Sequence, residues 1–179
     1  MRIPWRQLSL LPPILGVSDG ILNALTLAAG AILRGSGDGL DVTLALRVGA
    51  AAFVTAAFTM FVAYYSERRS HLVRAAKQLN ILEPRTLAAT NLGRAVLIET
   101  GVATATAAFA SLIGAVVPLL LGILLPTPAW VTLVITVGFL GALGWAIGAS
   151  LSARRTLWCL AMLLGGTIVT LVGAALDIA

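Results

Sequence analysis

Charged residues are scarce in this 179-residue sequence, where Asp, Glu, Lys and Arg together make up only 11%. A typical soluble domain is about one quarter charged. Hydrophobic residues make up 59%, and a soluble fold of this size keeps too much surface in water to hide so much apolar side chain. The composition therefore argues against an ordinary soluble domain and predicts a single transmembrane domain over residues 1–179.

Cysteine is nearly absent too. The single cysteine, Cys159, lies in an apolar run, which excludes an internal disulfide and predicts a packing role. Arg2 and Arg6 precede an apolar stretch of about 26 residues that has no clear small-residue cleavage site. That length favours a spanning helix over a cleaved signal peptide.

Five apolar segments reach the roughly 20 residues that a helix needs to cross a bilayer. We therefore expect an all-α integral membrane protein with five transmembrane helices, at residues 8–33, 44–65, 97–125, 130–151 and 157–175. Pro12 and Pro13 interrupt the first span and are expected to bend it or to free backbone carbonyls. Gly144 and Gly148 form a GxxxG pattern, which favours close helix packing.

Residues 66–94 form a polar connector between the second and third spans. Its apolar residues recur at helical spacing among basic ones, which is typical of an amphipathic helix. Such a helix either extends the second span or lies on the inner leaflet. A solvated basic connector and a lipid-recognition element are both compatible with this pattern.

The twelve basic residues are distributed unevenly between the two sides of the predicted bundle. Ten fall on one side, and only Arg34 and Arg47 fall on the other. Because basic residues mark cytoplasmic segments, the N-terminus is expected in the cytoplasm and the C-terminus outside. This orientation explains the net charge of +5, so we expect membrane lipid and no nucleic acid as a partner. The short chain without a targeting tail favours a prokaryotic plasma membrane.

Asp19 is the acidic residue that lies well inside a predicted span. An ionisable side chain in hydrocarbon costs about 2.5–3.5 kcal/mol on insertion scales, so it indicates function by default. Asn23 and Thr26 follow at i+4 and i+7 and share its helical face. Such an oxygen-rich stripe suits a divalent cation, and Gly20 permits another backbone to approach. The alternative is a protonated or helix-capping Asp19 that serves packing alone.

Other polar residues are weaker candidates for metal ligands. Met60 and Tyr64 are four residues apart in the second span, and a thioether suits ferrous iron, manganese or copper(I), although a lone membrane methionine usually packs. Glu67 and His71 have a two-ligand spacing, but two ligands without a third favour a solvated pair. Glu99 either lies at the interface or lines a vestibule. No nucleophile–base pair or metal triad is evident, so an enzyme is not expected.

The run Gly16-Val17-Ser18-Asp19-Gly20, continuing to Leu27-Ala28-Ala29-Gly30, resembles the first-helix signature of the vacuolar iron transporter family. Thr59-Met60 followed by Tyr65 is similar to positions in the second helix of that family. Gly114 with Pro118 matches a Gly-x-x-x-Pro pattern in its third helix. Five spans with a cytoplasmic N-terminus and a longer second connection also fit the family.

The resemblance implies a homodimer whose first helices line a pore and which exports ferrous iron or a related divalent metal in exchange for protons. Asp19 would be the pore carboxylate, Met60 a soft ligand, and the metal a transported ion with no permanently bound cofactor. The connector is short and basic, so the acidic metal-collecting domain is absent or reduced. The glutamates that members carry in the second helix correspond here to Ala52 and Tyr64.

These departures keep two other functions open. One is a non-transporting membrane scaffold or degenerate family member, for which the missing acids argue. The other is a transporter of a small organic or anionic substrate, which Tyr64, Tyr65 and the basic inner surface favour.

Overall fold

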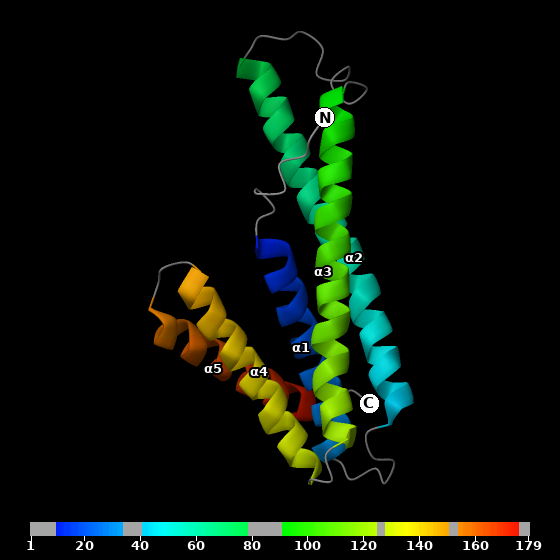
Figure 1. Ribbon diagram of the computed structural model, residues 1–179, viewed down its shortest axis with the longest axis vertical. Helices are drawn as coiled ribbons and strands as arrows, with labels where there is room; N and C mark the ends of the chain where they lie inside the picture. Colours follow the sequence, from blue (N-terminus) through cyan, green and yellow to red (C-terminus); the bar gives the residue numbers. More distant parts are fainter. Residues whose placement is uncertain (1–9, 34–40, 79–90, 125–127, 151–153, 176–179) are drawn as a thin grey trace.

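The computed structural model describes residues 10–33, 41–78, 91–124, 128–150 and 154–175, and these residues form five α-helices (Figure 1). The helices are α1 (Leu11–Leu33), α2 (Val42–Gln78), α3 (Asn91–Leu124), α4 (Ala129–Ser150) and α5 (Arg155–Ala175). Each is long and apolar enough to cross a membrane. The prediction of an all-helical protein with five membrane-length helices is therefore confirmed for the described part of the chain.

The boundaries differ most at α2, which runs 13 residues past the predicted end of its span to Gln78. The first part of the predicted connector is thus a continuation of α2. Its Glu, Arg, Leu, Ala, Lys and Gln residues are good helix formers, so the helix persists after the apolar run has ended. The rest of the connector up to position 90, and the predicted span ends at 8, 9, 125 and 151, lie outside the described residues.

The start of α1 also differs from the prediction. Leu10 precedes the helix, and its carbonyl accepts the backbone N–H of Ile14 at 3.2 Å. Pro12 and Pro13 therefore occupy the first turn, where a backbone N–H has no helical acceptor and proline is tolerated. They begin the helix and do not interrupt its middle.

The five helices form a bundle in which α1 contacts each of the other four. α2 and α3 pack along each other as an antiparallel pair, and α4 pairs with α5. Figure 1 shows that the end of α2 and the start of α3 extend beyond the start of α1. Large apolar side chains, including those of Phe58, Phe109 and Leu164, remain exposed around the bundle, as expected where lipid is the solvent.

Glycines set the closest helix contacts. A Cβ atom built on Gly16 would lie 2.1 Å from the carbonyl oxygen of Ala107, and one on Gly20 would lie 2.0 Å from that of Ser111. α1 and α3 therefore touch backbone to backbone, as expected from Gly20. The same holds at the predicted GxxxG of α4, where a Cβ on Gly148 would lie 2.8 Å from the Cα of Arg155 in α5.

Asp41 caps the start of α2. Its Oδ2 accepts the hydroxyl of Thr43 at 2.6 Å, and the backbone N–H groups of Val42 and Thr43 also donate to this carboxylate. The Thr43 hydrogen bond is the main cause that lowers the pKa of Asp41 below its ordinary value. The ionised form is thus the one that stabilises the helix.

We predict that Asp41→Ala lowers the melting temperature at pH 7, and that this difference disappears in acid. A lowered folded-state pKa means that the stabilisation is complete above the unfolded-state value of about 3.9. It is lost as the pH falls through the folded-state pKa. Thermal unfolding from pH 7 to roughly pH 3 measures this effect. Asp41→Asn retains a capping oxygen and should show little pH dependence; an equally pH-dependent Asp41→Asn protein would contradict the assignment.

Candidate functional site

Asp19 lies near the middle of the candidate span Leu11–Gly30 and is partly buried. Its Oδ2 accepts two side-chain hydrogen bonds, from the hydroxyl of Ser111 at 3.1 Å and from Nδ2 of Asn23 at 3.4 Å. The predicted shared face of Asp19 and Asn23 is therefore confirmed by direct contact. A carboxylate thus sits at mid-span with polar neighbours on two helices.

Ser111 connects three helices at this level. Its side chain is fully buried, and its hydroxyl lies 3.3 Å from the backbone carbonyl oxygen of Ala52 in α2 as well as 3.1 Å from Asp19. One hydroxyl proton cannot fully satisfy both acceptors. The result is a small group of oxygen atoms where α1, α2 and α3 meet, which we call the Asp19 cluster: Asp19, Asn23, Ser111 and the carbonyl of Ala52.

Ser111 was not predicted from the sequence, because it lies 92 residues from Asp19. One signal was available. Ser111, Gly114 and Pro118 follow one another at i, i+3 and i+7, so they share a face of α3. A polar residue in register with the glycine and proline of an otherwise apolar span points to the face that meets another helix.

Pro118 adds a further oxygen to this face. Proline has no backbone N–H, so the carbonyl of Gly114 lacks its usual donor four residues later. Gly114 packs on α1, since a Cβ built on it would lie 2.6 Å from the carbonyl oxygen of Val17. A backbone carbonyl without its helical partner therefore lies about one turn from Ser111.

Two more hydroxyls lie on the same face of α3 as Ser111, at Thr100 and Thr104. Both Oγ1 atoms are buried without a hydrogen-bond partner among the described residues. This is unusual, because Thr106 of the same helix donates to the carbonyl of Val102, as mid-helix threonines commonly do. The face between Thr104 and Ser111 carries only the small Ala107 and Ala108, and Gly16 packs over Ala107.

The remaining members of the predicted stripe lie elsewhere. The hydroxyl of Thr26 donates to the carbonyl of Leu22 at 2.8 Å, so it is engaged within its own helix. Met60 and Tyr64 are partly buried on α2. Met60 lies eight residues, or about 12 Å along the helix, from Ala52 and hence from the level of the Asp19 cluster. A role for Met60 as a ligand beside Asp19 stays a prediction.

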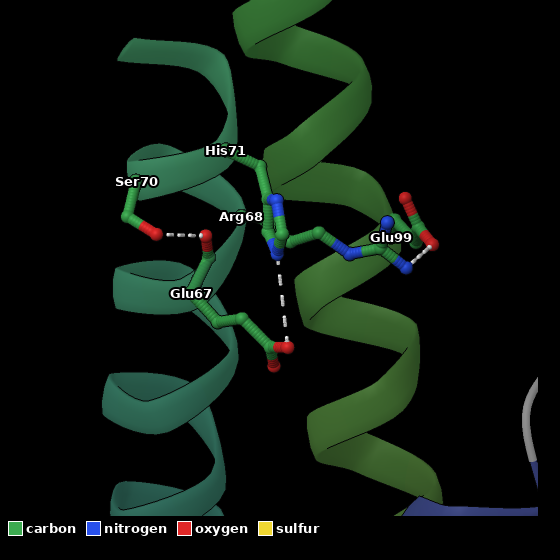
Figure 2. A network of polar contacts seen from close by, with 5 residues as sticks. All are labelled: Glu67, Arg68, Ser70, His71 and Glu99. Carbon is green, nitrogen blue, oxygen red and sulfur yellow. Dashed lines mark hydrogen bonds and ion pairs between the residues drawn. The ribbon is translucent and has the colours of Figure 1, made fainter. Parts of the chain in front are cut away.

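Figure 2 shows the polar contacts of Glu67, His71 and Glu99. Glu99 of α3 pairs with Arg68 of α2, so this acid links the two helices near the polar end of the hairpin. Nε2 of His71 lies 4.0 Å from Oε1 of Glu67, and both side chains are about two-thirds exposed, at 65% and 64%. Glu67 and His71 thus form an exposed pair, and Glu99 forms a separate ion pair with Arg68, at the end of α2 away from the Asp19 cluster.

The Asp19 cluster supplies only some of the ligands that a hard divalent cation needs. Carboxylate, hydroxyl, amide and carbonyl oxygens are the ligands that divalent cations of this type prefer. Each chain, however, supplies one negative charge there. Among the residues that the structure describes, no three His, Cys, Asp or Glu side chains form a group able to hold a metal ion. In one chain the Asp19 cluster therefore supplies a single charged ligand with neutral oxygen atoms beside it.

Comparison with known proteins adds no relative: no protein-family model matches this sequence, and no curated protein matches it. Its class rests on the described helices, which define a protein with five candidate membrane spans and a carboxylate at the centre of the first.

Proposed function

We propose that this protein is a proton-coupled transporter that moves a divalent metal cation, ferrous iron or manganese, out of the cytoplasm. The observation that carries the proposal is Asp19, a carboxylate at mid-span whose neighbours are the oxygen-bearing Ser111 and the carbonyl of Ala52. An acid retained at such a place indicates an ion or proton pathway by default. The resemblance of the first span to the vacuolar iron transporter family supports the same function.

In this mechanism Asp19 alternates between two states. Facing the cytoplasm, the ionised carboxylate binds the metal together with Asp19 of a second chain, and their two negative charges balance the cation. After the metal is released on the other side, the two carboxylates take up protons. The protonated site then turns back to the cytoplasm and releases the protons there. Two such carboxylates titrate as a coupled pair.

Two features of α3 support a route to this carboxylate. The buried hydroxyls of Thr100 and Thr104, which have no hydrogen-bond partner among the described residues, lie on the face of α3 that also carries Ser111. Thr104 lies about 10 Å from Ser111 along the helix. Between Thr104 and Ser111 this face of α3 carries the small Ala107 and Ala108, and Gly16 packs against Ala107.

The test is metal-dependent thermal stabilisation of the purified protein with Fe²⁺, Mn²⁺, Co²⁺ and Zn²⁺. A ligand at 100 times its Kd stabilises the folded state by about 2.7 kcal/mol, or roughly 5–10 °C for a chain of this size. We expect such a shift for wild type and for Asp41→Asn, and none for Asp19→Asn. Equal shifts in wild type and Asp19→Asn would remove Asp19 from metal binding.

One observation favours a second function, a non-transporting membrane scaffold. The hydroxyl of Ser111 on α3 donates to Oδ2 of Asp19 on α1, so this carboxylate also links the two helices and stabilises their packing. A scaffold predicts no metal-dependent stabilisation in any variant. A transporter of a small organic or anionic substrate predicts stabilisation by that substrate without competition from divalent metals.

A further inference from the structure

The exposed end of α2 carries arginines that the transport mechanism does not use. The apolar part of this helix runs from Leu44 to Tyr65, about 33 Å, which matches a hydrocarbon core of roughly 30 Å. Tyr65 stacks on Phe61, with ring centroids 5.9 Å apart, and tyrosines favour the membrane–water interface. The stretch that begins at Ser66 therefore enters the layer of lipid headgroups.

The two faces of this stretch have different partners. Arg68 points to α3, where it pairs with Glu99, whereas Ser70 lies on the opposite side of α2 (Figure 2). That outer face forms an open depression, which we call the arginine face; it is lined by Ser66, Arg69, Ser70, Val73 and Arg74. These residues recur at i, i+3, i+4, i+7 and i+8, which places them on one side of a helix.

The chemistry of the arginine face suits a phosphate group. Arg69 and Arg74 are exposed, and neither forms an ion pair among the described residues. Guanidinium groups bind phosphate oxygens in a bidentate manner, and the hydroxyl of Ser66 adds a further donor. Ser70 is less available, because its hydroxyl donates to the backbone carbonyl of Glu67 at 2.8 Å. Val73 provides an apolar contact between the charged groups.

The position of these residues relative to the membrane indicates that the phosphate belongs to a lipid headgroup. Arg69 lies about 6 Å and Arg74 about 13 Å beyond Tyr65 along the helix. The headgroup layer is about 5–8 Å thick on each side of the hydrocarbon core. Arg69 is therefore at phosphate level, and the long side chain of Arg74 can reach back to it. Exposed Arg94 on α3 adds positive charge near the same end of the hairpin.

We propose that the arginine face binds the phosphate of an anionic phospholipid and so holds the α2–α3 hairpin at the membrane surface. This assignment does not depend on metal transport, because it uses none of the residues of the Asp19 cluster. It gives the basic connector a specific partner, and it predicts that protein stability depends on the lipid headgroup charge.

The experiment compares phosphatidylglycerol with phosphatidylcholine as additives to the protein purified in a neutral detergent. Thermal unfolding is followed while each lipid is titrated in mixed micelles. We expect stabilisation by phosphatidylglycerol alone. Removing both charges in Arg69→Gln/Arg74→Gln should weaken the apparent lipid affinity roughly 30-fold, at about 5-fold per arginine near an anionic surface. The matched control Arg154→Gln/Arg155→Gln removes the same charge from the start of α5 and should retain most of the response.

Three results would overturn the proposal. Equal stabilisation of wild type by phosphatidylcholine would show that headgroup charge is not recognised. An equal loss of phosphatidylglycerol affinity in the two double variants would show that only the overall charge of the protein matters. Stabilisation of the wild type by inorganic phosphate alone, to the same extent as by phosphatidylglycerol, would assign the arginine face to a soluble phosphate compound. Because the first and third comparisons use wild-type protein, they decide the matter even if a variant fails to fold, and they leave the metal test unaffected.

Discussion

Replacing Gly20 with alanine should remove the native packing of α1 on α3, although only one methyl group is added. The new Cβ would lie 2.0 Å from the carbonyl oxygen of Ser111 and 2.9 Å from the backbone nitrogen of Ala115. These are backbone atoms, so no side chain can rotate away, and the helices must separate. Overpacking a well-fitted core costs about 1–3 kcal/mol, and occasionally more. We expect this variant at or beyond the upper end of that range.

The matched control is Gly101→Ala on α3. A Cβ at Gly101 meets nothing within 4 Å, so the substitution should be neutral or stabilise the helix, by up to about 1 kcal/mol. Size-exclusion chromatography and thermal unfolding in detergent measure both variants. A Gly20→Ala protein that elutes and melts like wild type would show that the α1–α3 contact is not as close as described.

The second large effect is expected for Asp19→Asn in reconstituted vesicles. Metal flux driven by a proton gradient should fall to the level of protein-free vesicles, a loss of at least about 100-fold, because removing a functional group that acts as a unit typically costs two or more orders of magnitude. Asparagine has nearly the same shape, and its carbonyl oxygen can still accept the hydroxyl of Ser111. The fold should therefore survive while the negative charge and the exchangeable proton are lost.

Two controls separate chemistry from folding in that experiment. Asp41→Asn changes an exposed carboxylate outside the candidate spans and should leave flux unchanged. The elution volume of Asp19→Asn should match that of wild type. Undiminished metal flux through a correctly folded Asp19→Asn protein would contradict the transport mechanism. Absence of metal flux in the wild type as well would favour the scaffold function.

The number and placement of the helices could be predicted from the sequence, because five apolar runs of membrane length are a strong signal. The helical pattern after Tyr65 left open whether that helix extends the second span or lies on the inner leaflet, and the structure shows the extension, to Gln78. Pro12 and Pro13 were expected to interrupt the first span because the apolar run begins before them, at Leu8. The structure starts the helix at Leu11.

The candidate site was predictable only in its local part. Asp19 and Asn23 are four residues apart, so their contact follows from helical spacing alone. The contact of Asp19 with Ser111 and that of Ser111 with Ala52 join three helices, and such contacts depend on how the helices rotate and slide against one another. A single sequence does not specify that register. The link between Arg68 and Glu99, 31 residues apart, was missed for the same reason.

The direct backbone contact at Gly16, Gly20 and Gly114 also limits how this molecule can move. Three such contacts over about two turns leave no layer of flexible side chains between α1 and α3. The two helices cannot slide past each other without a clash, so they must travel as one rigid body. Any rearrangement that exposes mid-span first to one side and then to the other has to take place where α1 meets other helices through side chains, as in the buried cluster that Leu25 shares with Leu140 of α4.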